Sequence, residues 1–134
     1  MSQYSILDRR PEEDILPLLE QHGIRLIARG PLARGILTEN GRAKLKQDYL
    51  DYSVQELAGL HNQLTQQTSG SRTLTQAALH YPLAHSPVAA IIPGASSIEQ
   101  LRLNVAAVES APLSPHELGT IRKASKANVY TAHR

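Results

Sequence analysis

Residues 91–100 read Ile-Ile-Pro-Gly-Ala-Ser-Ser-Ile-Glu-Gln, and this stretch decides the fold. An apolar run stops at a proline and a glycine, and two serines then precede a helical pattern, so a buried strand is followed directly by a helix. The amide groups of a helix's first turn lack partners within the helix and carry the positive end of its dipole. We therefore expect an anion site at this corner. The alternative is an ordinary strand-to-helix turn with serine caps.

Two other apolar runs read like the strand over residues 88–92 that leads into this corner. Residues 4–7 and 25–28 are bounded by glycine, proline or charged side chains, as is typical of parallel strands covered on both faces. Helical patterns occupy the stretches between and after the strands. Strands separated by helices pair in parallel through right-handed crossovers. The predicted fold class is α/β, with about three parallel strands, crossover helices and C-terminal helices.

Several helix boundaries can be predicted from capping patterns. Thr73 and Gln76, and likewise Ser97 and Gln100, have the spacing of a capping box. Pro82 falls inside the helix that Thr73 opens, so we expect that helix to kink or loosen before residue 85. The helix after Ser97 carries a stripe of apolar residues at helical spacing, which consists of Ile98, Leu101, Val105 and Val108.

A second segment with a binding pattern follows the strand over residues 25–28. Residues 28–37 read Ala-Arg-Gly-Pro-Leu-Ala-Arg-Gly-Ile-Leu, so two arginines and two glycines come directly after a strand end. Guanidinium groups bind phosphate oxygens in pairs, and such a loop suits a pyrophosphate. The alternative is a plain connecting loop with surface arginines.

Composition excludes several classes of function. The 134 residues suit one domain, and 14 basic against 12 acidic residues leave a net charge of only +2, which does not provide the basic face that nucleic-acid binding needs. No apolar run reaches the length of a membrane span, and the N-terminus lacks the pattern of a signal peptide, so we expect a cytoplasmic protein without a membrane partner. There is no cysteine, and the six histidines show no metal-ligand spacing, so no metal site is expected.

Taken in order, these segments resemble the aldo-keto reductase family. Residues 4–13 look like the family's sixth barrel strand and the loop after it, and residues 23–38 look like the seventh strand and its cofactor loop. Residues 91–104 are similar to the eighth strand and the segment that holds the cofactor's adenosine phosphate. From residue 111 onward the chain resembles the family's last helices. The resemblance implies that residues 1–134 form the C-terminal half of an aldo-keto reductase domain, a partial TIM-type (β/α)8 barrel.

The family transfers hydride between a nicotinamide cofactor, usually NADPH (NADP+), and a carbonyl group, and the resemblance implies a role for each loop. Arg29 stands where many members have an aromatic residue that stacks on nicotinamide. Ser96 stands where related sequences often carry arginine, so NADH is expected as an alternative to NADPH. The pyrophosphate would lie along Gly30, Leu32 and Arg34. The adenosine and its phosphate would lie against Gly94, Ala95, Ser96, Ser97, Gln100 and Asn104.

The resemblance also implies what this chain does not supply. The family's catalytic Asp, Tyr, Lys and His belong to strands earlier than the first one here, so no catalytic residue is expected in the chain. The expected protein is a truncated or split aldo-keto reductase that binds the dinucleotide and is inactive, or nearly so, alone. Its protein partner would be an N-terminal half-barrel chain or a second copy of itself. The alternatives are a non-catalytic nucleotide-binding module and a structural half-barrel that self-associates.

Overall fold

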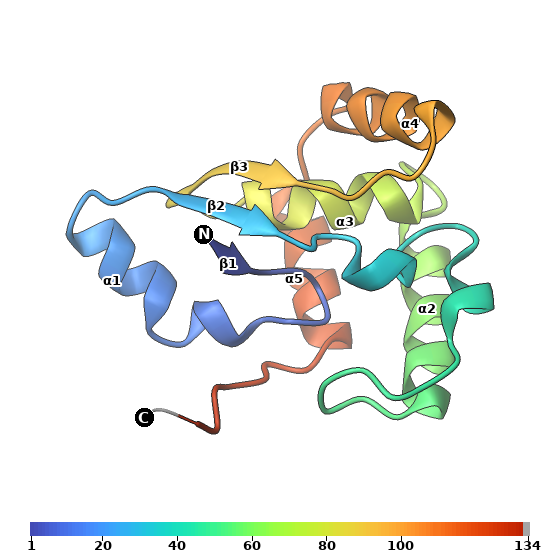
Figure 1. Ribbon diagram of the computed structural model, residues 1–134, viewed down its shortest axis with the longest axis horizontal. Coiled ribbons are helices and arrows are strands. Elements are labelled where there is room, and N and C mark those ends of the chain that lie inside the picture. Colours follow the sequence, from blue (N-terminus) through green and yellow to red (C-terminus); the bar gives the residue numbers. More distant parts are fainter. Residues whose placement is uncertain (133–134) are drawn as a thin grey trace.

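The computed structural model describes residues 1–132, which form a three-stranded parallel sheet with helices packed around it (Figure 1). The strands lie in the order β1-β2-β3, and Ala28 of β2 pairs with Ser2 on one side and Ile91 on the other. This arrangement confirms the α/β class and a partial barrel. The strands are β1 (Ser2–Gln3), β2 (Leu26–Arg29) and β3 (Val88–Ile92), the helices are α1 (Ile15–Gln21), α2 (Val54–Thr68), α3 (Leu74–Leu83), α4 (Ile98–Glu109) and α5 (Pro115–Ala124), and the 3-10 turns are η1 (Arg10–Glu12), η2 (Ala33–Gly35) and η3 (Gly41–Lys44).

The first predicted strand was misplaced. The observed strand is β1, whereas the sequence predicted a strand over residues 4–7. The amide of Tyr4 still donates to the carbonyl of Arg29 at 3.1 Å, and the chain then leaves the sheet. Ser5 and Asp8 then close a tight turn, in which each amide donates to the other's carbonyl at 3.2 and 3.1 Å. The apolar side chains of this turn are fully buried. An apolar run predicts burial, but it does not distinguish a strand from a turn that packs into the core.

The helix starts follow the predicted capping chemistry, with one correction. Thr73 and Gln76 form a complete capping box at the start of α3. At α4, Ser97 accepts from the amide of Gln100 at 3.1 Å, but the Gln100 side chain accepts from the amide of Ser96 at 2.8 Å rather than from that of Ser97. Pro82 lies in the last turn of α3, which ends at Leu83, so the expected disruption is the end of the helix.

One face of the sheet is covered and the other is open. Leu26 and Ala28 of β2 are buried, whereas Ile27 is 42% exposed and Arg29 is also exposed. Successive side chains of a strand point to opposite faces, so only one face of β2 packs against helices. The core on the covered face includes Tyr4, Leu57, Leu64, Leu74, Tyr81 and Ile121.

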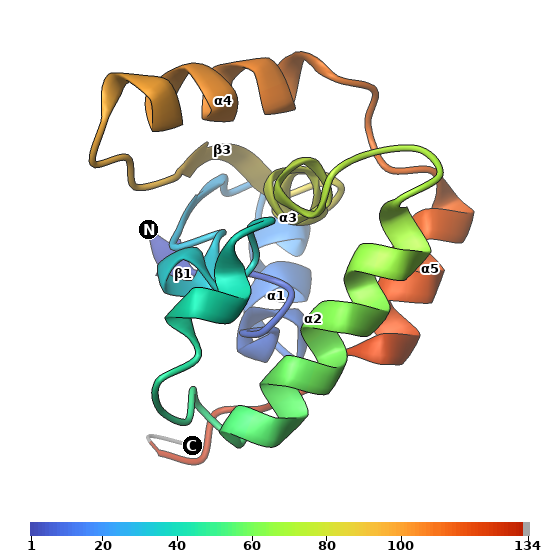
Figure 2. The same cartoon turned by 90° about the vertical axis from the view of Figure 1, so that its right-hand side faces the viewer.

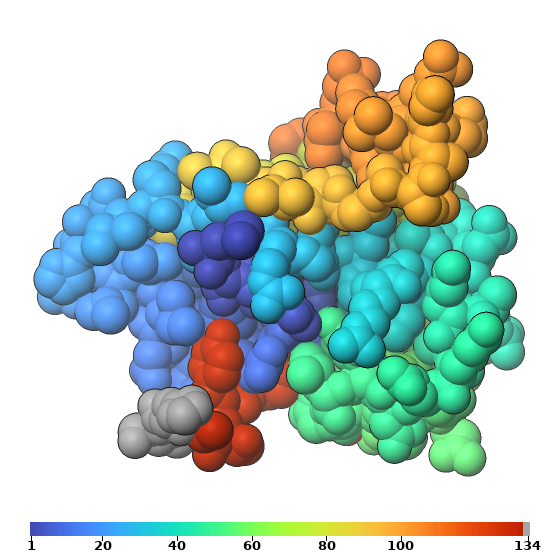
Figure 3. Space-filling model, viewed as in Figure 1, coloured from blue at the N-terminus to red at the C-terminus, as the bar shows by residue number. Residues whose placement is uncertain are grey.

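Helix α4 exposes an apolar stripe. It packs against α3 through its inner face and lies on the opposite side of β3 and α3 from the other helices (Figures 2 and 3). Its buried residues are Asn104 and Ala107. The α4 stripe remains exposed at 72, 55, 49 and 38% for Ile98, Leu101, Val105 and Val108, respectively. The outer edge of β3 also pairs with no other strand within residues 1–132. The outer edge of β1 likewise pairs with no other strand, so the described part of the chain leaves one helix face and two strand edges unpaired.

A buried polar network joins the loop after β1 to the C-terminal end of α5. The hydroxyls of Tyr4 and Tyr81 both donate to Oε1 of Glu12, and Arg9 donates to both carboxylate oxygens at 2.9–3.2 Å. Arg9 also donates to the carbonyls of Arg122 and Ser125 at 3.0 and 3.1 Å. Burial raises the pKa of Glu12, but the hydrogen bonds from Arg9 and Tyr81 outweigh it, so the net pKa is lowered.

None of the helices within residues 1–132 has the length and apolar run needed to span a membrane.

The Glu12 network predicts a pH-dependent contribution to stability. A lowered carboxyl pKa stabilises the folded state above the ordinary value of 4.5, and this contribution is lost as the pH falls below that value. Glu12→Gln should therefore lower the free energy of unfolding by about 2 kcal/mol at neutral pH, because it removes the charge that faces Arg9. The difference from the unsubstituted chain should shrink towards pH 3. Urea unfolding at both pH values measures it, and a difference independent of pH would contradict the argument.

Leucines of the core and of the α4 stripe should respond differently to truncation. Leu57 is 1% exposed and Leu101 is 55% exposed. Leu57→Ala should cost about 2 to 5 kcal/mol because it opens a cavity. Leu101→Ala should change the free energy of unfolding by under about 0.5 kcal/mol, because the Leu101 side chain buries little apolar surface. Denaturant titration of the two variants tests this, and a large cost at Leu101 would mean that the stripe is covered in solution.

Candidate functional site

A cavity of about 790 Å³ opens where the loop after β2, the start of α3 and the segment after β3 meet. Its size falls within the range of small-ligand pockets. Because β2 and β3 are parallel, their carboxyl ends lie at the same edge of the sheet, and ligands of such folds bind at that edge. Most of the residues predicted to bind the cofactor line the cavity, namely Gly30, Leu32, Arg34, Gly94, Ala95, Ser96, Gln100 and Asn104.

The corner at the start of α4 is less open than the sequence predicted. The side chain of Gln100 takes the Ser96 amide, and the side chain of Ser97 takes the Gln100 amide. Within the described residues, no protein acceptor takes the amides of Ser97, Ile98 and Glu99. Asn104 is 7% exposed and donates to the carbonyl of Gly94 at 3.3 Å, which ties the turn to the helix. Three of the four amides at the start of α4, those of residues 97–99, therefore remain free to bind an anion.

The loop after β2 owes its shape to left-handed backbone conformations. Gly30 and Gly35 have φ of 66 and 86°, and Ala33 and Arg34 adopt φ of 47 and 59°. Non-glycine residues in this region carry strain, which often marks binding loops. The loop closes through backbone bonds from Ala33 to Gly30 at 3.0 Å and from Gly35 to Leu32 at 2.9 Å. Arg34 is thereby placed on the cavity wall.

The next turn, η3, is held against this loop by close packing. A Cβ on Gly41 would lie 1.8 Å from the carbonyl oxygen of Ile36, so only glycine fits there. His61 is 4% exposed, and its Nε2 lies 2.8 Å from the carbonyl oxygen of Thr38. These contacts fix the backbone that leads to Lys44, another residue of the cavity wall.

Arg29 and Ser97 were predicted to bind cofactor but do not line the cavity. Ser97 caps α4. Arg29 lies at the end of β2, where its guanidinium donates to Oε1 of Gln3 at 3.2 Å. Gln3 in turn donates to the hydroxyl of Tyr49 at 2.9 Å, and the Arg34 guanidinium lies 5.8 Å from the centre of the Tyr49 ring. Arg29 and Arg34 are thus linked across the ends of β1 and β2.

Sequence reasoning missed the part of the wall that comes from the start of α3. Thr73, Thr75 and Gln76 line the cavity together with Glu39. Glu39 accepts from the amide and hydroxyl of Thr75 at 3.0 and 2.7 Å. Burial raises the pKa of Glu39, but the hydrogen bonds from Thr75 prevail and lower it overall, so the carboxylate remains ionised. The Thr73 capping box marked the helix start, but no sequence signal placed that start beside the loop after β2.

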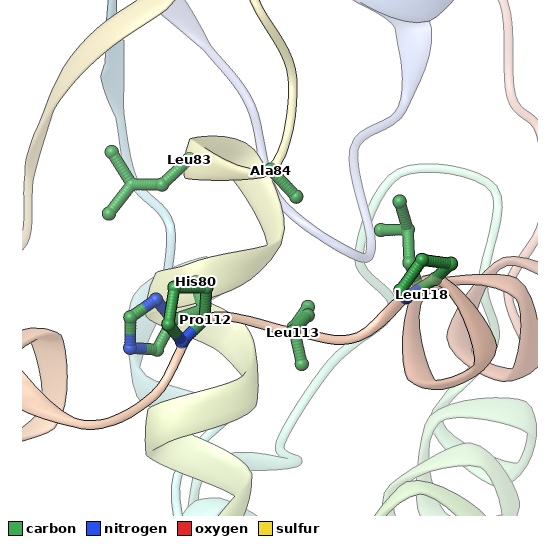
Figure 4. Close-up of a pocket in the computed structure, with 7 residues that line it drawn as sticks. His80, Leu83, Ala84, Pro112, Leu113 and Leu118 are labelled. Carbon is green, nitrogen blue, oxygen red and sulfur yellow. The ribbon is translucent and has the colours of Figure 1, made fainter.

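A second hollow, of about 420 Å³, differs in character (Figure 4). Leucine, proline and alanine side chains form most of its wall, and His80 is its only titratable lining residue among those described. Nε2 of His80 lies 3.1 Å from the Ala107 carbonyl and the Ser110 hydroxyl, and burial lowers the pKa of the imidazole. Across residues 1–132, no group of three histidines and carboxylates is placed to hold a metal ion. The larger cavity is therefore the better site for a charged ligand.

Comparisons with known proteins agree on one family. The model of the Aldo/keto reductase family matches residues 1–126. The chain is 42% identical, over its whole length, to the uncharacterized oxidoreductase YqkF of Bacillus subtilis, and covers 45% of that protein. Over 77% of its length it is 33% identical to a pyridoxal 4-dehydrogenase of Microbacterium luteolum, and it covers 30% of that protein.

Solved structures give the same result. The holo form of the aldo-keto reductase AKR11C1 from Bacillus halodurans superposes with a TM-score of 0.88 at 45% identity, over 100% of this chain and 46% of that one. The sequence thus spans less than half the length of these relatives. The match to the family model over nearly all of the described residues shows that this chain belongs to the aldo-keto reductase family.

Proposed function

We propose that this chain supplies the nicotinamide-dinucleotide-binding part of an aldo-keto reductase that reduces aldehydes or ketones with NADPH, and that it accepts NADH as an alternative. The observation that carries the proposal is the cavity of about 790 Å³, because it gathers two segments that are far apart in the sequence and were each predicted to bind the cofactor. Membership of the family supports the reaction class. Residues 1–134 would be the C-terminal half of the reductase domain.

The residues around the cavity suit a dinucleotide. The free amides of residues 97–99, at the start of α4, would offer donors for the adenosine phosphate, whereas the Ser96 hydroxyl already donates to Oε1 of Gln100 at 3.0 Å. Arg34 offers a guanidinium for the pyrophosphate. Arg29, held by Gln3 at 3.2 Å, would orient the nicotinamide end. The cofactor supplies the hydride, and this chain's residues position it.

We propose further that the groups that protonate the substrate carbonyl come from polypeptide beyond this chain. In the family, those residues belong to strands earlier than β1. The uncovered α4 stripe and the free edge of β3 support the proposal, because a closed barrel would pair that edge and cover that helix face. Either a separate chain or a longer form of this protein could supply those proton-donating groups.

Adding a cation at residue 96 should alter the choice of dinucleotide. Both NADPH and NADH should bind the chain and raise its Tm, because a ligand stabilises the state that binds it. Ser96→Arg should improve NADPH binding relative to NADH about tenfold, since the guanidinium would pair with the 2′-phosphate. Calorimetric titration with both dinucleotides measures the ratio, and NADH acts as the internal control for general charge effects. An unchanged ratio would place the 2′-phosphate elsewhere.

Reconstitution tests the need for the rest of the barrel. Alone, the chain should oxidise NADPH with an aldehyde at no more than the uncatalysed rate. Mixed with a polypeptide that corresponds to the remaining part of the Bacillus halodurans reductase, it should show turnover. The double variant Leu101→Glu, Val105→Glu should lose this turnover but keep dinucleotide binding, because it alters only the α4 stripe. Aldehyde reduction by the purified chain alone would refute the proposal.

A further inference from the structure

We infer that Lys44 is a further phosphate-binding residue of the dinucleotide cavity, and that its ammonium group pairs with the pyrophosphate. The inference rests on the proposed function, since it names an additional contact in the same site. No sequence motif pointed to Lys44. It comes from the position of η3 relative to the loop after β2.

The Lys44 side chain lies over the loop segment that lines the cavity. Its Cε and Cγ atoms lie 3.7 and 3.8 Å from the point that a Cβ on Gly35 would occupy. Gly35 follows Arg34 directly, and both residues line the cavity together with Lys44. The lysine stem therefore runs along the segment proposed for the pyrophosphate.

The backbone that carries Lys44 is held in place. The amide of Gly41 donates to Thr38 at 2.9 Å, and the amide of Ala43 donates to Asn40 at 3.2 Å. The carbonyl oxygen of Thr38 lies 2.8 Å from Nε2 of the buried His61. With this backbone anchored, only the flexible stem needs to adjust when an anion enters.

The charges of the cavity single out Lys44. Arg34 and Lys44 are the only arginine or lysine side chains among the described lining residues, and the wall formed by residues 94–107 contributes neither. The guanidinium of Arg34 already lies against the ring of Tyr49 at 5.8 Å. Nζ of Lys44 makes no ion pair with any residue in the described range. The one lining carboxylate, that of Glu39, is held by Thr75. Lys44 thus has an uncommitted positive charge.

The position of Lys44 favours the pyrophosphate over the 2′-phosphate. Lys44 shares its wall with Gly30, Leu32 and Arg34, whereas Ser96 and Gln100 form the opposite wall. The adenosine ribose, with any 2′-phosphate, is proposed to lie on that opposite wall. A cation on the loop wall should therefore act equally on NADPH and NADH, which share the pyrophosphate.

Removal of the charge tests the inference in the full chain. Lys44→Met should weaken binding of both NADPH and NADH about tenfold, the order expected for one charge-assisted hydrogen bond. Lys46→Met is the matched control, since Lys46 is exposed on the same segment but does not line the cavity, and it should change both dissociation constants less than about twofold. Lys44→Arg should retain most of the affinity. Calorimetric titration with each dinucleotide provides the constants, and urea unfolding checks that each variant is folded.

Three results would overturn the inference. Equal effects of Lys44→Met and Lys46→Met would show a general charge effect. A loss confined to NADPH would assign the ammonium to the 2′-phosphate. If the unsubstituted chain bound neither dinucleotide, the proposed function itself would fail, and this outcome is distinct because it appears before any variant is compared.

Discussion

Parallel pairing of β2 with β3 is the constraint on which the rest of the structure depends. Arg29 pairs with Ile92, so Gly30 and Pro93 leave the sheet side by side at the same edge. Two segments that lie far apart in the chain thereby become opposite walls of one cavity. A shift of register by one residue would exchange the buried and exposed faces of β2 and separate the walls. The buried side chains of Leu26 and Ala28 hold that register.

Helix α4 buries fewer large apolar side chains than α2 does. Elsewhere in the chain, apolar stripes face the core, as at Leu57 and Leu64 of α2. In α4 the buried residues are Asn104 and Ala107, and the larger apolar side chains are exposed. Burial of apolar surface contributes roughly 25 cal/mol per Å², so α4 gains little from its own packing. A bound ligand or a covering polypeptide would therefore add contacts to a helix that has few of its own.

Local chemistry could be predicted from the sequence, whereas tertiary contacts could not. The Thr73 capping box and the strand that ends at Ile92 follow from residue type and spacing, and both are present. The first strand was misplaced because an apolar run is equally compatible with a buried turn. The Gln100 side chain could not be placed, since Ser96 and Ser97 offer it amides one residue apart. Gln3, Glu39 and Lys44 reach the site through contacts between distant segments, which no periodicity encodes.

The partial capping of α4 explains why the opposite wall matters. A helix start attracts anions through free amides, but here the side chains of Ser97 and Gln100 occupy two of them. An anion at this corner either accepts from the amides of residues 97–99 alone or displaces the Gln100 side chain from the Ser96 amide. Each alternative gives a weaker site than a fully open helix start, because fewer donors are free or one hydrogen bond must break. Tight binding of a dinucleotide in this cavity therefore requires positive charge from the loop after β2, which is held in place by its own strained turns and by Gly41.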